Sequence, residues 1–174
     1  GAHTSRTDIA LTEHGRRRAE ELREFLAGVK FDAVFVSPMR RARDTARIAG
    51  FDGPVVDDGL KEWDYGVFEG RTTAEIRREA PGWSVWTSDI VDGETVEQVG
   101  ERADGVIARA LAAAPAGGRV ALFAHAHLLR ILAARWLGLP AVDGRLFVLG
   151  TGSLSVLGWE RETRAIVSWN RGFE

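Results

Sequence analysis

The stretch from Val120 to Ala124 constrains the fold of this chain more than any other. It is a run of apolar residues that is too short for a helix and has no polar face, so it predicts a strand buried on both sides. The residues from Leu128 to Leu137 are apolar around most of their circumference, which predicts a packed helix. His125 is therefore expected between the carboxyl end of a strand and a helix. Open α/β sheets bind ligands at this place, and helix amino termini attract phosphate.

A second stretch repeats this design. Residues Phe31 to Val36 predict another short strand, and Pro38 suits the first turn of a helix that is expected to run to about Ala49. If the two strands are parallel neighbours, the amino-terminal ends of the two helices meet. Arg40 and Arg41 would then lie where the helix dipole disfavours cations unless an anion is present. This misfit predicts an anion site, most simply a site for phosphate.

The remaining pattern alternates helices and strands, with Thr12 expected to cap a helix that ends near Leu26. The sequence predicts an α/β fold with a mostly parallel central sheet flanked by helices, in one domain over residues 1–174. Residues Gly1 to Leu11 are polar and are expected to form a surface loop. Capping-box patterns open a short helix at 72–75 and a long one at 95–98, an edge strand is expected at 55–56, and closing strands are expected at 147–148, 153–159 and 165–169.

Composition limits the classes of function. A length of 174 residues with 45% hydrophobic content is enough for a domain with a real core. The net charge of −2 provides no basic field for nucleic acid or for a membrane surface. The chain has no cysteine, which removes thiol catalysis and thiolate metal sites and fits a cytoplasmic location. We therefore expect a cytoplasmic protein whose partner is a small molecule, not nucleic acid or a membrane, with a homodimer left open.

His125 and His127 have several interpretations. Either could be structural, as a buried histidine or a surface cap. On a strand, the two imidazoles would share one face and could bind a metal, but a metal site needs further ligands and Arg130 would repel the ion. We therefore expect no metal and no cofactor. The segment from Asp57 to Gly70 mixes acids, aromatics and glycines, which indicates a functional loop, with Glu62 as one acid among several.

Several segments in order resemble the histidine phosphatase superfamily, which has the phosphoglycerate-mutase-like fold. The resemblance implies a three-layer α/β architecture over nearly the whole chain. The amino-acid sequence at 62–66 and 152–158 is similar to that of the small sugar-phosphate phosphatase branch. The matching segments are 37–46 (SPMRRARDTA), 60–62 with 69–70, 93–95 (GET), 123–127 (FAHAH) and 4–12, which resembles the segment after the first motif of the family.

The resemblance implies metal-independent hydrolysis of small phosphate monoesters, such as sugar phosphates or phosphoglycerate-type compounds, through a phosphohistidine. The nucleophile of the family lies in an Arg-His-Gly motif that belongs upstream of Thr4, and this motif does not occur in the sequence. By the same resemblance, Arg41 clamps the phosphoryl oxygens, His125 neutralises the transferring group, and Glu62 is the proton donor and acceptor. The substrate-binding positions implied are Thr4, Ser5, Tyr65, Ala126 and His127.

Alternatives to this hypothesis stay open at the level of sequence. One is phosphotransfer of the phosphoglycerate mutase type on the same site. Another is an inactive homologue that binds a phosphate ligand, because the Arg-His-Gly motif is missing and Ala126 stands where the family usually has glycine. A metallohydrolase is the remaining and least favoured alternative. The phosphatase hypothesis makes one geometric prediction, which is that Arg41, Glu62 and His125 meet around a single tetrahedral anion.

Overall fold

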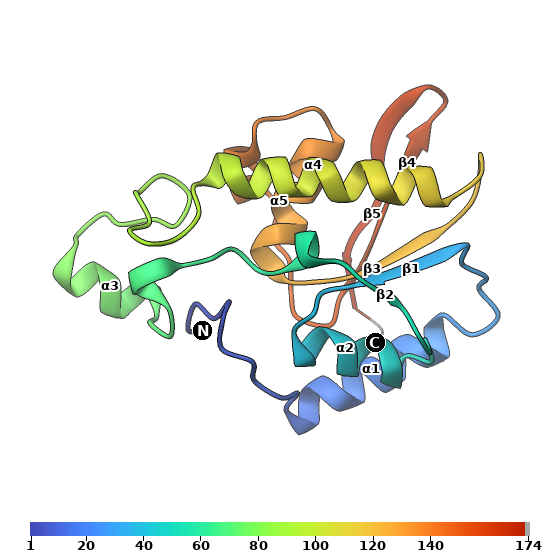
Figure 1. The fold of residues 1–174 in the computed structure, drawn as a ribbon, viewed down its shortest axis with the longest axis horizontal. Helices are drawn as coiled ribbons and strands as arrows, with labels where there is room; N and C mark the ends of the chain where they lie inside the picture. The colour runs from blue at the N-terminus through green and yellow to red at the C-terminus, as the bar shows by residue number, and fades with distance from the viewer. Residues whose placement is uncertain (173–174) are drawn as a thin grey trace.

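The computed structural model describes residues 1–172 and contains a three-stranded parallel sheet (Figure 1). Its strands are β1 (Ala33–Val36), β2 (Val55–Val56) and β3 (Val120–Phe123), in the order β2-β1-β3. Since β1 and β3 are parallel and in register, their carboxyl ends lie at the same edge. Both valines of β2 are 56% exposed. The predictions of parallel neighbours and of an edge strand at 55–56 are confirmed.

Helices cover both faces of this sheet, as Figure 1 shows. Helices α1 (Glu13–Phe25) and α2 (Arg40–Ile48) lie on one face, where Val36 and Phe123 join their apolar cluster. Helices α4 (Val96–Ala113) and α5 (Ala126–Trp136) lie on the other face with Phe35 and Leu122. Successive strand residues point to opposite faces, so each strand supplies both clusters. The result is the three-layer α/β architecture that the sequence predicts.

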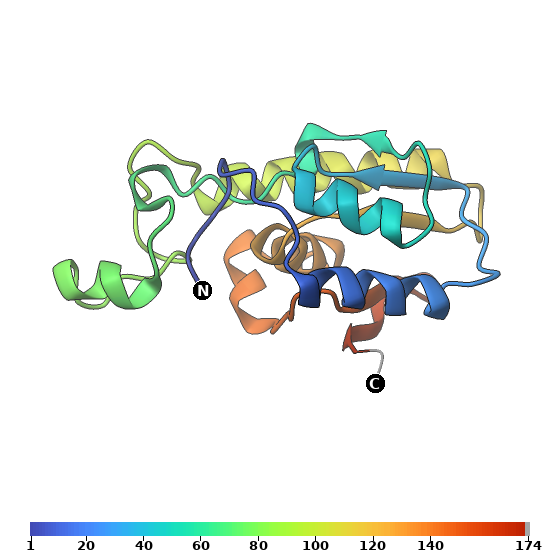
Figure 2. The ribbon, with the colours of Figure 1, turned by 90° about the horizontal axis from the view of Figure 1, so that it is seen from below.

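Threonine side chains begin three of the helices, as predicted. Thr12 accepts a hydrogen bond from the N–H of Gly15 at the start of α1. Thr72 and Thr95 form complete capping boxes at α3 (Thr73–Glu79) and α4, which satisfy backbone donors that the helix leaves unpaired. Figure 2 shows that α3 lies at the end of the molecule farthest from the sheet. Among the described residues, no helix is both long and apolar enough to cross a bilayer.

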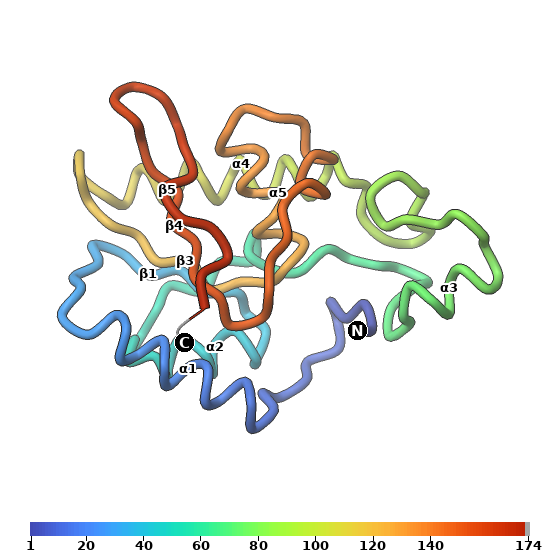
Figure 3. The backbone as a smooth tube through the Cα atoms, turned by 180° about the vertical axis from the view of Figure 1, so that it is seen from behind, coloured from blue at the N-terminus to red at the C-terminus, as the bar shows by residue number. Residues whose placement is uncertain are grey.

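The last two strands form an antiparallel hairpin, β4 (Leu154–Glu160) and β5 (Thr163–Arg171), which Figure 3 shows from behind. The predicted strand at 147–148 is wrong. This segment follows the 3-10 helix η3 (Ala141–Leu146) and enters no strand ladder of the described residues. The carbonyl of Val148 instead accepts a hydrogen bond from the indole N–H of Trp169, and its side chain is 74% exposed.

The functional loop predicted at 57–70 is anchored in the core between α4 and α5. It contains the 3-10 helices η1 (Asp58–Leu60) and η2 (Gly66–Phe68). Leu60, Trp63 and Tyr65 are at most 2% exposed and belong to the larger apolar cluster. Burial of such large side chains is strongly stabilising. The loop therefore presents its polar residues from a fixed backbone.

Candidate functional site

His125 lies between β3 and α5 and occupies the N-cap position of that helix. Its backbone is extended, and the helix begins at Ala126, two residues earlier than the sequence predicts. His127 is therefore in the first helical turn and does not share a strand face with His125. This geometry corrects the strand arrangement on which the metal alternative depended.

The imidazole of His125 connects Arg41 to Ser37. Arg41 Nε donates to His125 Nδ1 at 3.1 Å, and because arginine only donates, Nδ1 is the acceptor. The neutral ring then carries its proton on Nε2, which donates to Ser37 Oγ at 2.8 Å. Burial lowers the pKa of His125 to about 4, because the charge of Glu62 opposes burial only in part and Arg41 adds to it. Ser37, which is fully buried, is a site residue that the sequence predictions missed.

The carboxylate of Glu62 lies against the first turn of α5. Its Oε2 accepts from the N–H of His127 at 3.1 Å, and its Oε1 accepts from the N–H of Leu128 at 3.0 Å. The N–H of Trp63 also donates to Oε1, at 3.0 Å. Glu62 is only 7% exposed. The structure thus brings Glu62 to the helix that follows His125, and Arg41 contacts His125 directly.

The two arginines at the start of α2 have different surroundings. Arg41 turns toward His125 and also donates to the carbonyls of Thr4 and Thr7, each at 3.1 Å. Arg40 points away, with a side chain that is 59% exposed. Its N–H donates to the carboxylate of Asp8 at 2.6 Å, so an acid of the chain itself lies at this helix terminus. The carboxylate of Asp8 therefore supplies part of the negative charge that the sequence predicts beside the two arginines at this helix terminus.

The amino-terminal segment is attached to the site by Glu69. Its carboxylate accepts from the N–H and Oγ of Ser5, at 2.8–3.0 Å, and from the N–H and Oγ1 of Thr7, at 2.9–3.0 Å. Burial alone would raise the pKa of Glu69, but these hydrogen bonds outweigh it and lower the pKa. Ser5 is 6% exposed, so the prediction of a surface loop is wrong at this residue. The hydroxyl of Ser5 faces Glu69.

Aromatic rings form one wall beside His127. Tyr65 Oη and His127 Nδ1 are hydrogen-bonded at 2.6 Å. The ring of His3 lies 4.9 Å from that of Tyr65 and 5.4 Å from that of Trp83, and Trp86 lies 5.2 Å from His127. Burial lowers the pKa of His127 to about 3 and raises the pKa of Tyr65. Both side chains are therefore uncharged at neutral pH. His3 is not among the predicted site residues, because nothing in its sequence context distinguishes it.

Residues 1–172 contain no cluster of three or more histidine, cysteine, aspartate or glutamate side chains that could hold a metal ion.

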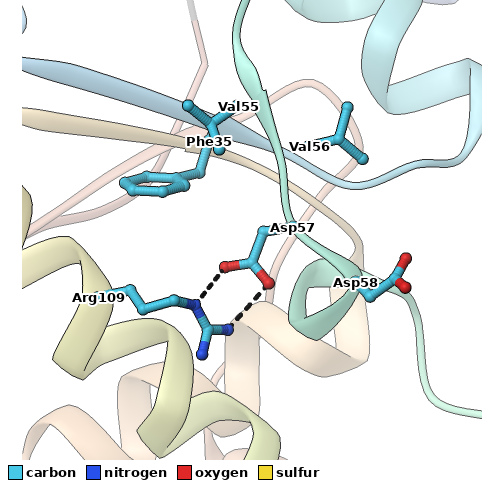
Figure 4. A pocket seen from close by; sticks show the side chains of 6 residues that line it. All are labelled: Phe35, Val55, Val56, Asp57, Asp58 and Arg109. Carbon is cyan, nitrogen blue, oxygen red and sulfur yellow. Dashed lines mark hydrogen bonds and ion pairs between the residues drawn. The ribbon is translucent and has the colours of Figure 1, made fainter.

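A separate pocket of about 330 Å³ lies at the β2 edge of the sheet (Figure 4). There Arg109 forms a two-pronged ion pair with Asp57, at 2.8 and 2.9 Å. This pocket is lined by none of the predicted site residues.

The family model of the histidine phosphatase superfamily (branch 1) matches residues 1–172. The chain belongs to this superfamily. It is 40% identical over 169 residues to an acid phosphatase of Mycobacterium tuberculosis, a match that covers 95% of this chain and 82% of the relative. It is 34% identical over 170 residues to sedoheptulose 1,7-bisphosphatase of Saccharomyces cerevisiae, with 80% of this chain covered but only 62% of the yeast enzyme.

Solved structures of similar proteins agree with the fold. A protein encoded by an open reading frame of Mycobacterium tuberculosis has a TM-score of 0.93 and 38% identity, covering 100% of this chain and 91% of its own. Mycobacterial glucosyl-3-phosphoglycerate phosphatase has a TM-score of 0.84 and 28% identity, with 98% and 92% covered. These relatives confirm the predicted three-layer fold and the expectation of a phosphoric monoester hydrolase with a small substrate.

Proposed function

We propose that the protein hydrolyses small phosphate monoesters, of the sugar-phosphate or phosphoglycerate type, through a phosphohistidine. Arg41, Glu62 and His125 form the reaction centre. The observation that carries this proposal is the direct contact of Arg41 with His125 at the start of α5, with the Glu62 carboxylate on the same helical turn. A cationic fork, an imidazole N–H and a buried carboxyl group are suited to phosphoryl transfer, which depends mainly on positioning and charge stabilisation.

The proposed reaction has two steps. First, the nucleophilic histidine forms a bond to phosphorus while the bond to the ester oxygen breaks, and Glu62 gives this oxygen a proton. Second, the oxygen of a water molecule attacks phosphorus, the bond to the histidine breaks, and Glu62 takes a proton from the water. Oε2 of Glu62 accepts one backbone N–H, from His127, whereas Oε1 accepts two, so we propose that Oε2 is the oxygen that carries the proton.

Arg41 and His125 carry the phosphoryl group in this proposal. The guanidinium of Arg41 binds two non-bridging oxygens in a planar fork. When substrate binds, the Nε2–H of His125 turns from Ser37, to which it donates in the structure, and donates to a third oxygen. Thr4, Ser5, Tyr65, Ala126 and His127 are proposed to line the substrate mouth, and no metal or cofactor takes part.

The test is phosphate release by the full-length gene product, since the Arg-His-Gly motif of the family is not among these 174 residues. We expect turnover of sugar phosphates that a chelator leaves unchanged, and an acid-labile phosphoenzyme after rapid quenching. Arg41→Ala should lower kcat/KM by about a hundredfold or more. Arg40→Ala is the matched control, because among residues 1–172 its exposed side chain pairs with Asp44 alone, at 3.5 Å, and it should change kcat/KM by less than about threefold.

Equal effects of the two arginine substitutions would overturn the assignment of Arg41. Transfer of phosphate within a monophosphoglycerate, without release, would instead establish mutase chemistry. Phosphate binding without any turnover of the full-length protein would establish the inactive homologue. The homodimer and the cytoplasmic location stay predictions, which sedimentation of the purified protein and fractionation of its source cells would test.

A further inference from the structure

The loop that carries Glu62 is held by a single guanidinium from helix α4. Arg102 uses all five of its N–H donors. Two of them form a bidentate ion pair with Glu94, at 2.7 and 2.8 Å. The other three go to backbone carbonyls, at 2.8 Å to Gly59, 3.0 Å to Lys61 and 3.4 Å to Glu62.

Glu94 also contacts the same loop, through the residues that follow Glu62. Its carboxylate accepts from the N–H of Asp64 at 3.0 Å, and its own N–H donates to the carbonyl of Asp64 at 3.0 Å. Its carbonyl accepts the indole N–H of Trp63 at 2.8 Å. The Arg102–Glu94 pair therefore contacts the chain before, at and after Glu62. The side chains of the pair are 22% and 24% exposed, so most of this network is shielded from water.

Burial of Leu60 and Trp63 fixes where the loop enters and leaves the core, but apolar contacts do not set the rotation of the peptide groups between them. Three backbone carbonyl groups that converge on one point need hydrogen-bond donors there. Their convergence on the planar fork of Arg102 fixes the peptide planes on both sides of the Glu62 Cα. Those planes set the direction of the Glu62 Cα–Cβ bond and of the Trp63 N–H, which donates to the carboxylate that two N–H groups in the first turn of α5 also hold.

Given the proposed phosphatase function, on which this inference rests, we propose that Arg102 and Glu94 are positioning residues that aim the Glu62 carboxyl at the ester oxygen. Neither residue touches substrate. Their effect should appear only in steps that need proton transfer by Glu62. Activated aryl phosphates expel a weakly basic phenolate and need little protonation, whereas alkyl phosphates expel a strongly basic alkoxide and need it fully.

The experiment compares kcat/KM on p-nitrophenyl phosphate with kcat/KM on glycerol phosphate for the full-length protein, because kcat/KM reports formation of the phosphohistidine and not its hydrolysis, which needs Glu62 for either substrate. Arg102→Lys keeps the charge but loses the planar fork and two donors. We expect its glycerol phosphate kcat/KM to fall by about tenfold or more, as part of the roughly 10²–10⁴-fold that general acid–base catalysis contributes, while its p-nitrophenyl phosphate kcat/KM changes by less than about threefold. Glu94→Gln should shift the ratio in the same direction. Because both substrates are assayed on one preparation, the ratio does not depend on the fraction folded.

Arg109→Lys is the matched control. Arg109 lies on the same helix and forms an equally short bidentate pair, with Asp57 (Figure 4), but it donates to none of the carbonyls around Glu62. Its two kcat/KM values should change in parallel. A parallel loss for Arg102→Lys as well would reduce Arg102 to a structural role and overturn the inference.

Glu62→Gln separates this inference from the proposed function. If Glu62→Gln shifts the ratio and Arg102→Lys does not, the positioning inference fails and the acid–base role of Glu62 stands. If Glu62→Gln leaves the ratio unchanged, the proposed role of Glu62 itself fails.

Discussion

Ala126 is the residue at which this chain departs from the usual glycine of its superfamily. It is the first residue of α5, directly after His125, at a helix amino terminus of the kind that binds phosphate. A methyl group at this place hinders close approach, and glycine removes it. The departure therefore bears on catalytic rate, while the fold accommodates it.

Replacing Ala126 by glycine should raise kcat severalfold and tighten inhibition by inorganic phosphate. The cost to stability should be at most about 1 kcal/mol, because the position is at a helix end. Steady-state kinetics and chemical denaturation measure both effects. Ala133→Gly, at a fully buried position of the same helix, is the control and should lose stability without gaining rate. Unchanged or slower turnover in Ala126→Gly would show that the methyl group does not obstruct the phosphate.

Residues of the site differ in how far sequence alone identifies them. His125 follows directly from the strand–helix pattern, which does not choose between the two arginines at the start of α2. The resemblance adds Arg41, Glu62 and Ser5. The pairing of Ser5 with Glu69 does not follow from either, because 64 residues separate them. The chain has 25 acids and 23 basic residues, so no local rule selects which of them pair.

At the level of elements, the loop after Tyr65 packs backbone to backbone against the segment before α4. Gly66 has a φ of +50°, and a Cβ there would overlap the carbonyl oxygen of Val91. A Cβ at Gly93 would likewise overlap the carbonyl oxygen of Asp64. The loop can therefore approach Glu94 only because these two positions lack side chains.

Gly66→Ala should destabilise the protein by about 3 kcal/mol or more, because the backbone must move as well as adopt a strained φ. Gly82→Ala is the control, since Gly82 has a φ of +86° but no atom within 4 Å of an added Cβ. It should cost only about 1 kcal/mol. Urea denaturation of both variants gives the difference in their unfolding free energies. Similar losses of stability would show that the two segments can move apart at little cost.

Element boundaries were predictable where a local signal exists. Threonine caps fix the starts of α1, α3 and α4, and glycine or proline follows most of the helices. The strand at 147–148 failed because two apolar residues do not reveal whether a neighbouring strand is present. The early start of α5 was missed because Glu62, far away in sequence, supplies the acceptor for its first N–H groups.

For the whole molecule, two histidines buried without charge make stability depend on pH. The folded-state pKa is lowered to about 4 for His125 and about 3 for His127, from 6.5. Below pH 6.5 the unfolded chain therefore binds protons that the folded chain does not. Stability falls as pH drops from 6.5 toward 4.

Between pH 7 and pH 5, each of these histidines should cost about 2 kcal/mol of unfolding free energy. In His127→Gln the loss over this interval should be smaller than in the wild type by about that amount, measured by urea denaturation at each pH. An identical loss in both proteins would mean that His127 is protonated in the folded state. We also expect one cooperative transition over the chain, since the two apolar clusters share β1 and β3.

The anchoring of Ser5 and Thr7 by Glu69 has a practical consequence for protein engineering. It keeps His3 against Tyr65, and Ala2 pairs with Thr72 near α3. Any chain or tag that is attached ahead of Gly1 therefore leaves the domain close to Tyr65 and His127. A bulky group in that place should compete with large substrates for space, so a reporter is better joined to a surface far from this segment.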